Sequence, residues 1–232
     1  MDGTRSWRPP STRPSGSQPG NREALTNPDA AADGPAERPI AGVVLAAGSS
    51  TRFGRNKLLL TLDGESLVRR ACRAAIEAGL SPVVVVLGHD ADRVREELSG
   101  LSSSAVVNPA HARGLNTSLA VGIAAVPAEA AAAVVLLADM PRVTAEMVAR
   151  LARTFRETGA PLVASHYGGV HAPPTLYART LFPDLGGPEG DGGGKRVVLQ
   201  HAQDAVRVEW PAAALADVDR EEDWERLGVP TS

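Results

Sequence analysis

The sequence has almost no cysteine, little net charge and no long apolar run, and each shortage excludes a class of protein. Cys72 is the only cysteine among 232 residues, so a disulfide framework or a zinc site of several cysteines is excluded. The net charge of −3 argues against a general nucleic-acid-binding surface. No run approaches the ~18 consecutive apolar residues of a membrane-spanning helix. We therefore expect a cytoplasmic protein without membrane or nucleic-acid partners.

The first 38 residues differ in composition from the rest of the chain. Proline, glycine, serine, arginine and aspartate dominate them, and Trp7 is their only aromatic residue. Such a segment buries too little apolar surface to offset the entropy lost on ordering, and it lacks the apolar centre of a secretory signal. The composition predicts a disordered leader over residues 1–38 and a single folded domain over residues 39–232.

Buried strands alternate with amphipathic helices within the folded domain. Continuous apolar runs predict strands at residues 40–46, 82–88, 104–108, 132–139, 160–165 and 205–210. Apolar residues spaced three and four apart predict helices over 67–79, 90–98, 117–126, 144–159 and 219–227. This alternation predicts an α/β fold, a three-layer αβα sandwich with a mostly parallel sheet. Ligands of such sheets bind beyond the carboxyl ends of the strands.

Two segments interrupt this pattern. Residues 166–201 are rich in glycine and proline with few strand or helix signals, which predicts a long irregular functional loop. Residues 48–57 follow the first strand and combine small residues with the cations Arg52, Arg55 and Lys57. Small residues let main-chain N–H groups turn toward an anion, and the cations add charge for phosphate oxygens. Neither the Walker loop nor the dinucleotide fingerprint fits, and a solvated basic loop is the alternative.

The stretch LAAGSSTRFGRNKLLL, residues 45–60, resembles the signature L-A-A-G-x-S-x-R-M-G-x-x-K of the molybdenum cofactor cytidylyltransferases and other MobA-like NTP transferases. The resemblance implies a Rossmann-like nucleotidyltransferase fold. It also implies that Arg52 and Lys57 bind phosphates and that the nucleotide site is lined by Leu45, Ala46, Ala47 and Gly48. In this family Ala-Ala-Gly in place of Ala-Gly-Gly accompanies cytosine, so Ala47 favours CTP over GTP.

Two further stretches resemble the metal-binding motifs of the family. LLADMP, residues 136–141, is similar to the family pattern L-x-x-D-x-P, so Asp139 is the expected Mg²⁺ ligand. A carboxylate at a strand end beside a phosphate loop suits that role, although an aspartate there can also simply close a turn. DVDREEDWERL resembles a C-terminal D-x-D motif and implies Asp219 as the second ligand, with Asp217 as a weaker neighbour. Helix capping is the alternative for Asp219.

The remaining motifs concern the nucleotide and the acceptor. NPAHARGLNTSL resembles the stretch that contributes to the base and ribose pocket, which implies nucleotide contacts from Asn108, Gly114, Thr117 and Ser118. Ser118 could equally cap a helix. The stretch GDGGGKR keeps a family skeleton and implies acceptor contacts from Gly190, Asp191, Lys195 and Arg196. His89 receives no chemical role, and a zinc site at His166 and His171 is not expected because no further ligand lies nearby.

The resemblance implies Mg²⁺-dependent transfer of CMP from CTP to molybdopterin with release of pyrophosphate. Lys57, Arg52 and Asp139 are the expected catalytic residues, and a molybdoenzyme or its chaperone is the implied protein partner. One alternative is a nucleotidyltransferase for another small phosphate. Two others are a flavin- or NAD(P)H-dependent reductase of a small heteroaromatic substrate on the same scaffold, and a non-catalytic carrier of the cofactor.

Overall fold

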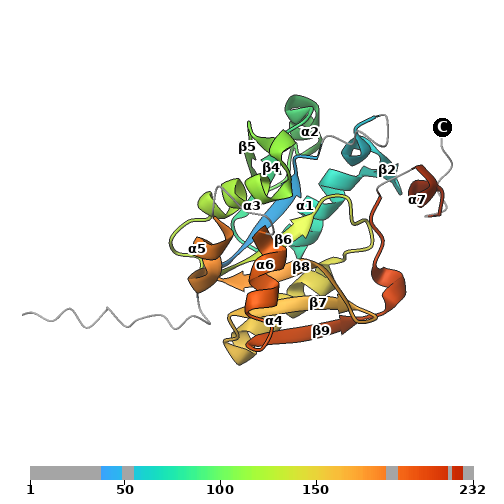
Figure 1. The fold of residues 1–232 in the computed structure, drawn as a ribbon. Helices are drawn as coiled ribbons and strands as arrows, with labels where there is room; N and C mark the ends of the chain where they lie inside the picture. Colours follow the sequence, from blue (N-terminus) through green and yellow to red (C-terminus); the bar gives the residue numbers. More distant parts are fainter. Residues whose placement is uncertain (1–37, 49–54, 187–192, 219–220, 227–232) are drawn as a thin grey trace, which may run out of the picture. The chain divides into compact units, whose positions relative to one another are not determined.

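A seven-stranded sheet forms the centre of the fold, with strand order β5-β4-β1-β6-β8-β7-β9 (Figure 1). The computed structural model describes residues 38–48, 55–186, 193–218 and 221–226. The strands of the sheet are β1 (Ile40–Ala46), β4 (Val83–Leu87), β5 (Ser104–Val107), β6 (Ala132–Leu137), β7 (Leu162–Tyr167), β8 (Val170–Ala178) and β9 (Ala205–Trp210). Only β8 pairs antiparallel with its neighbours in this sheet. A separate two-stranded ribbon consists of β2 (Thr61–Leu62) and β3 (Glu65–Ser66).

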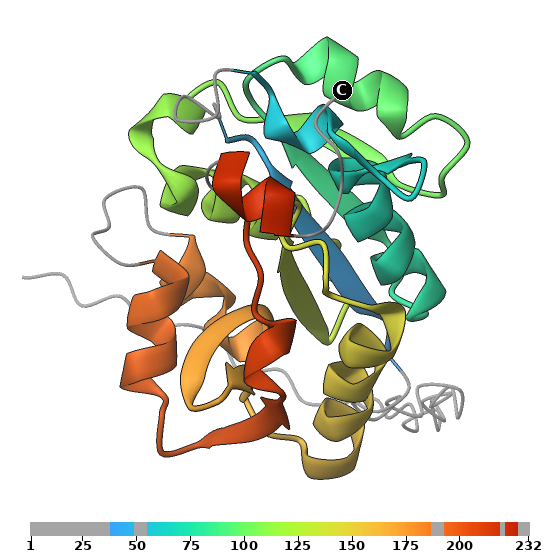
Figure 2. The same cartoon turned by 90° about the vertical axis from the view of Figure 1, so that its right-hand side faces the viewer.

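Helices cover both faces of the sheet. The α-helices are α1 (Leu67–Glu77), α2 (Ala91–Glu97), α3 (Leu115–Ala124), α4 (Ala145–Thr158), α5 (Phe182–Leu185), α6 (Gly193–Gln200) and α7 (Glu221–Arg226). Short 3-10 turns are η1 (Lys57–Leu59), η2 (His111–Arg113), η3 (Arg179–Leu181) and η4 (Ala212–Ala214). Helices α1, α2 and α4 cover one face and α3, α5 and α6 the other (Figure 2). Their buried side chains belong to two separate clusters. The predicted three-layer αβα sandwich with a mostly parallel sheet is therefore confirmed.

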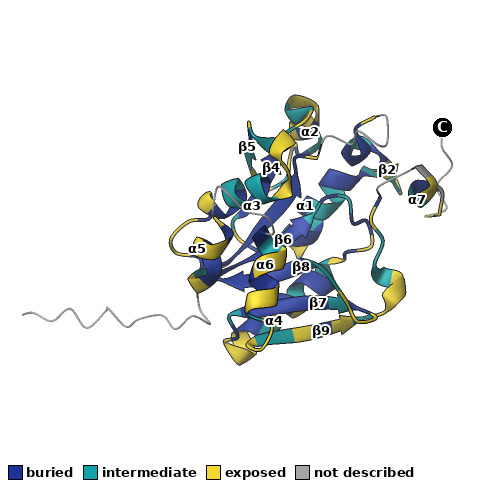
Figure 3. Cartoon of the chain, in the orientation of Figure 1, coloured by how far each residue is buried: buried dark blue, intermediate teal, exposed yellow. Residues whose placement is uncertain are grey.

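Strand β1 is buried along its whole length, as its uninterrupted apolar run predicts (Figure 3). Val44 packs in the cluster that contains Val68 and Cys72 of α1, whereas Val43 packs in the cluster of α3 with Leu119. Alternate residues of a strand point to opposite faces, so one strand supplies both layers of the core. Each such side chain contributes about 1.5–3 kcal/mol through burial.

Helix α4 follows the capping rules that its sequence suggests. The Thr144 hydroxyl accepts a hydrogen bond from the Met147 N–H at 3.3 Å, and Gly159 ends the helix with φ at +64°. Thr144 thus satisfies one of the first N–H groups, and glycine adopts the left-handed conformation without steric cost. The apolar face of α4 is buried as predicted. The other predicted helices and strands also occur, with bounds that differ by a few residues.

The prediction of one long irregular loop over residues 166–201 is wrong. This segment contains β8, an interior strand of the sheet, followed by η3, α5 and α6. Gly168 and Gly169 form the two-residue hairpin turn between β7 and β8, with φ at +59° and +88°. Such positive φ values are typical of the turns that join right-twisted antiparallel strands. The Gly-Gly pair in the sequence could therefore have indicated this hairpin.

Two prolines hid strand β8 from the sequence pattern. Pro173 and Pro174 lie where the β7–β8 register shifts, and the pairing of β8 with β6 begins only at Thr175. Proline has no N–H to give to a ladder, so it is tolerated at such a bulge. The Tyr167 hydroxyl donates a hydrogen bond to the Pro173 carbonyl at 2.9 Å, which bridges the irregular stretch.

Some sequence predictions fall outside the described residues. The leader is one of them, because residues 1–37 are not described. Within the described ranges, no helix has both the length and the apolar character needed to cross a bilayer. Trp224 of α7 is buried as predicted, whereas Leu227, which was predicted to point inward with it, is not described.

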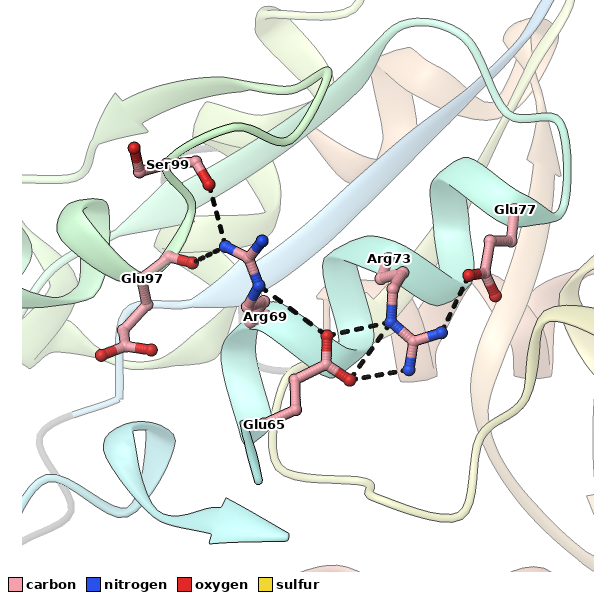
Figure 4. A network of polar contacts seen from close by, with 6 residues as sticks. All are labelled: Glu65, Arg69, Arg73, Glu77, Glu97 and Ser99. Atoms are coloured by element: carbon pink, nitrogen blue, oxygen red, sulfur yellow. Dashed lines mark hydrogen bonds and ion pairs between the residues drawn. The ribbon is translucent and has the colours of Figure 1, made fainter. Parts of the chain in front are cut away.

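A charged network fastens the β3–α1 corner (Figure 4). The Glu65 carboxylate accepts hydrogen bonds from Arg73 at 2.7 and 2.9 Å. Arg69 lies 3.9 Å from the same carboxylate and donates to the Glu97 and Ser99 carbonyls at 2.7 and 2.9 Å. The hydrogen bond from Arg73 lowers the pKa of Glu65, an effect that burial opposes and nearby arginine charges reinforce. The network ties α1 to the turn after α2.

We predict that Glu65→Gln lowers the free energy of unfolding at pH 7 by about 1 kcal/mol, because the charge-assisted pair with Arg73 is lost. The folded protein lowers the pKa of Glu65. Its contribution is therefore present above the unfolded pKa of about 4.3 and is lost as the pH falls through the folded pKa. Urea unfolding at pH 7 and pH 3 tests this.

The matched control is Glu77→Gln, which removes the other carboxylate bound to Arg73 at 2.8 Å. The Glu77 side chain is 50% exposed against 16% for Glu65, so its loss should cost at most about 0.5 kcal/mol. Equal effects of the two variants at pH 7, or an undiminished Glu65→Gln effect at pH 3, would contradict this account.

Candidate active site

An ion pair joins η1, which lies in the chain after β1, to Asp139, which follows the end of β6. The Lys57 Nζ lies 2.7 Å from Oδ2 of Asp139, and these side chains are only 11% and 21% exposed. Lys57 is held in place by η1, because the Asn56 side chain caps that turn by accepting from the Leu58 N–H at 3.1 Å. Leu58 itself is buried in the core. Because both side chains are largely shielded from water, the attraction between their charges is stronger than it would be on an open surface.

The ion pair lies where the strand order of the sheet reverses. Strands β4 and β5 lie on one side of β1, and β6 lies on the other. Beyond the last paired residues, the Ala138 N–H still donates to the Leu45 carbonyl at 3.1 Å. The carboxyl ends of β1 and β6 therefore stay together up to Asp139. A crevice at such a switch point is the usual ligand site of an open α/β sheet.

The C-terminal D-V-D stretch reaches the same place. The Val218 N–H donates to the Asp139 carbonyl at 3.0 Å, and the Val218 side chain is fully buried. Trp224 packs in the same small cluster. The chain thus passes Asp139 immediately before residue 219. Asp219 itself lies outside the described residues, as does Arg52, so their assigned roles stay predictions.

A cavity of about 330 Å³ opens beside the ion pair. Lys57 and Asp139 line it, together with several of the residues that the sequence predicts to bind a nucleotide: Leu45, Ala47, Gly48, Gly114 and Ser118. Ala46 is buried on the other side of β1 and packs in the cluster of α1. The structure therefore brings Gly48 and Lys57 from the two ends of the first loop, the 108–118 segment and Asp139 to one cavity.

Asn108 organises the segment that forms one wall of this cavity. Its carboxamide donates to the hydroxyls of Thr117 and Ser118, both at 2.9 Å, and accepts from the Ala110 N–H at 2.9 Å. Asn108 is 1% exposed. The Thr117 hydroxyl donates to the Gly114 carbonyl at 2.9 Å. In this state Asn108 and Thr117 hold the wall together, and their predicted contacts with a nucleotide stay predictions.

His111 also lines this cavity, although the sequence analysis assigned it no role. Its Nδ1 atom is buried without a hydrogen-bond partner in the described structure. The ring packs against Gly88 at the end of β4, where an added Cβ would lie 2.7 Å from the His111 Cβ and 2.6 Å from the Ala47 carbonyl oxygen. Its position in the stretch NPAH, directly after a predicted strand, is the feature of the sequence that could have indicated a place in the ligand site. Glycine at position 88 lets the three segments approach closely.

A larger cavity, of about 750 Å³, adjoins the first and shares Leu45, Leu115 and Leu137 with it. Its other walls come from β8, α6 and the segment before α7, and most of them are apolar. Three large apolar side chains on its rim are exposed: Leu115 by 56%, Val170 by 55% and Leu199 by 69%. Exposed apolar side chains gathered around one cavity are typical of a ligand site.

The polar groups of the larger cavity differ from the predicted set. Lys195 and Asp217 line it, whereas the Arg196 guanidinium lies away from it and donates to the Asp184 carbonyl at 3.2 Å. Gly190 and Asp191 lie outside the described residues. His171 lines the cavity and lies 3.1 Å from the Thr175 hydroxyl. Burial, with His166 nearby, lowers the pKa of His171, which favours a neutral imidazole at neutral pH.

The Asp139 carboxylate at the first cavity is a suitable oxygen ligand for a divalent cation such as Mg²⁺. Within the described ranges, no three His, Cys, Asp or Glu side chains gather closely enough to enclose a metal ion. Mg²⁺ does not require such an enclosure, because it usually keeps water and binds one or two carboxylates together with phosphate oxygens. The Asp139 carboxylate faces the cavity beside Lys57. This single partly exposed carboxylate suits a metal that arrives with a phosphate ligand.

Comparison with known proteins agrees with this geometry. The profile of a family described as the MobA-like NTP transferase domain matches residues 42–206. The chain is 28% identical over 207 residues to the purine catabolism protein PucB of Bacillus subtilis (strain 168), covering 81% of this chain and 95% of that protein. It is 32% identical over 178 residues to a probable molybdenum cofactor guanylyltransferase of Mycobacterium tuberculosis (strain ATCC 25618 / H37Rv), covering 73% and 83%.

A solved structure shares the same fold. The crystal structure of Rv0371c from Mycobacterium tuberculosis H37Rv superposes with a TM-score of 0.73 at 28% identity, covering 82% of this chain and 97% of that chain. The complex of Rv0371c with manganese superposes with a TM-score of 0.70 at 27% identity, covering 82% and 97%. A divalent metal is thus found in a protein of similar fold.

We predict that Gly88→Ala lowers the free energy of unfolding by about 1–3 kcal/mol, because the new methyl group would overlap the Ala47 carbonyl and the His111 ring. Thermal unfolding measures this. Gly48→Ala is the matched control, since a Cβ at that cavity-lining position meets no atom of the described residues within 4 Å. If the two variants unfold at the same temperature, the close approach of these segments is not a constraint.

Proposed function

The chain belongs to the MobA-like NTP transferase family, and we propose that it transfers CMP from CTP to molybdopterin, forming molybdopterin cytosine dinucleotide and releasing pyrophosphate. The family and the fold establish a nucleotidyltransferase. The identities of the donor, the acceptor and the metal are the proposal. The cytoplasmic setting and a molybdoenzyme or chaperone as protein partner stay predictions.

The observation that carries the proposal is the Lys57–Asp139 ion pair, which lines the smaller of the two adjoining cavities. The pair places the Lys57 cation of η1 beside the Asp139 carboxylate, which follows the carboxyl end of β6. A triphosphate needs a cation on its oxygens and a carboxylate that can share a metal with them. A flavin- or nicotinamide-dependent reductase requires neither, so the pair supports nucleotidyl transfer over that alternative.

The proposed reaction is an in-line displacement at phosphorus. A phosphate oxygen of the acceptor attacks the α-phosphorus of the nucleotide; a new P–O bond forms while the bond to the β-phosphate breaks, and pyrophosphate leaves with that electron pair. The attacking oxygen is already anionic, so no strong general base is required. Catalysis rests on positioning and on neutralisation of charge.

Lys57 has the central part in this neutralisation. Its ammonium balances Asp139 in the present structure and lines the same cavity as the main-chain groups of Ala47 and Gly48. When a triphosphate enters, the ammonium can move to its oxygens, with Arg52 as the proposed second cation. Asp139, with Asp219 as the proposed second ligand, would hold Mg²⁺. That ion, when bound, supplies further positive charge to the phosphates.

The larger cavity supports an acceptor with a bulky ring system. Its walls are mainly apolar and its exposed rim consists of Leu115, Val170 and Leu199. A sugar or alditol phosphate would place many hydroxyl groups against carbon, which costs free energy unless each finds a partner. A fused heterocycle buries its flat faces instead. Lys195 at the wall can meet the anionic part of such an acceptor.

Two observations point to different nucleotides. Ala47 is buried and lines the nucleotide cavity, and its place in the Ala-Ala-Gly stretch favours CTP. The relative named as a probable guanylyltransferase favours GTP, which is the second candidate donor. A pyrophosphate-release assay with molybdopterin and each of the four ribonucleotides tests the proposed function directly, and a panel of sugar and alditol phosphates tests the acceptor.

We predict that Asp139→Asn reduces metal-dependent pyrophosphate release at least about 100-fold, because it removes the carboxylate charge while keeping the side-chain size. The control is Asp92→Asn. Asp92 also pairs with an arginine at 2.7 Å, but its side chain is 94% exposed and lines neither cavity. Activity of Asp139→Asn within tenfold of the wild type would exclude the assigned role.

We predict that Ala47→Gly lowers the ratio of CTP to GTP turnover several-fold, because the Ala47 methyl group lines the wall against which the base is proposed to lie. Ala112→Gly is the control, since it trims an exposed methyl group from the same cavity. The specificity ratio kcat/KM for the two nucleotides is the measurement. An unchanged ratio would remove Ala47 from the selection of the base.

A further inference from the structure

A third cavity, of about 420 Å³, lies at the opposite end of the sheet from the ion pair. Ala131 and Pro161, which line it, directly precede β6 and β7, and Arg38 lies two residues before β1. These are the amino ends of the parallel strands, about 20 Å from their carboxyl ends for a strand of six residues. Three arginines, Arg38, Arg156 and Arg179, line this cavity.

Main-chain carbonyls hold two of these arginines in place. Arg38 donates to the Glu129 and Ala128 carbonyls at 2.9 and 2.6 Å. Arg179 donates to the Ala130 carbonyl at 2.5 Å and also to the Pro127 carbonyl. All four acceptors belong to the loop after α3. An arginine has five N–H donors, so each guanidinium keeps three for another ligand after these two bonds.

Arg156 completes the set from the last turn of α4. It is exposed, and within the described part of the chain its guanidinium makes neither a hydrogen bond nor an ion pair. Phe155, the preceding residue, is buried and adds an apolar wall to the cavity. The Arg179 guanidinium lies 4.8 Å from the centre of the Phe182 ring, which further restricts its orientation.

Among the described residues, no carboxylate balances the positive charge of this cavity. None of the three arginines pairs with a carboxylate of the described residues. The carbonyl ends of α3 and α4 offset about half a charge each, so about two of the three positive charges remain. Interaction with the carbonyl end of a helix would account for one arginine, but it does not explain why three arginines line the same cavity.

We infer that this cavity binds the phosphate group of a small phosphomonoester. Guanidinium groups match the spacing of phosphate oxygens and bind them through paired hydrogen bonds. The volume lies in the range of small-molecule sites, so there is room for an organic group beyond the phosphate. Because the cavity lies at the amino ends of the strands, such a ligand does not compete with a triphosphate at Lys57.

The test is calorimetric titration of the full chain with two probes, inorganic phosphate and glycerol 3-phosphate, in low-salt buffer that limits screening. The expected result is binding of glycerol 3-phosphate that Arg156→Ala weakens at least fivefold. Arg156→Lys, which keeps the charge but not the paired donors, should bind more tightly than Arg156→Ala and more weakly than the wild type. Inorganic phosphate binding equally well would show that the organic group contributes nothing and would overturn the phosphomonoester assignment.

Two controls locate the site. Arg153→Ala removes an exposed arginine of the same helix that pairs with Glu146 and does not line the cavity, so its binding should stay within twofold of the wild type. Lys57→Ala should also bind as the wild type does. The inference is overturned if no heat is measured, if Arg156→Ala and Arg153→Ala behave alike, or if Lys57→Ala abolishes binding.

Discussion

The contact between Lys57 and Asp139, at 2.7 Å, is the interaction on which the candidate active site depends. It exists because β1 and β6 end side by side at the point where the strand order reverses, and η1 holds Lys57 beside that edge. A carboxylate and an ammonium with little exposure stabilise each other only as a pair, and each alone would be costly to bury. A triphosphate with its metal offers both groups new partners at once, which makes the pair a suitable docking point.

The scaffold around this pair separates two kinds of recognition. The smaller cavity holds the charged side chains of Lys57 and Asp139 together with Ser118, among leucine, alanine and glycine residues. The Asn108 carboxamide holds one wall of it together through three hydrogen bonds. The larger cavity is bounded by leucine, valine and methionine side chains from distant segments. Since the cavities share Leu45, Leu115 and Leu137, a charged nucleotide and a bulky acceptor can meet beside Lys57.

Much of this could be predicted from the sequence because the signals were local. Lys57 and Asp139 each follow a buried strand, and parallel strands bring such positions to one edge; Thr144 and Gly159 mark the ends of α4 directly. Strand β8 was missed because Pro173 and Pro174 argue against a strand, although Gly168 and Gly169 are typical of a hairpin turn. The apolar cavity could not be predicted, since Leu115, Val170 and Leu199 resemble ordinary surface or core residues until the fold assembles them.

The most direct test of the central claim is a crystal structure of the protein with CTP and Mg²⁺. We expect the triphosphate in the cavity between Gly48 and Ser118, the metal on the Asp139 carboxylate and the Lys57 ammonium on a phosphate oxygen. A nucleotide bound elsewhere, with Lys57 and Asp139 still in contact at 2.7 Å, would contradict it.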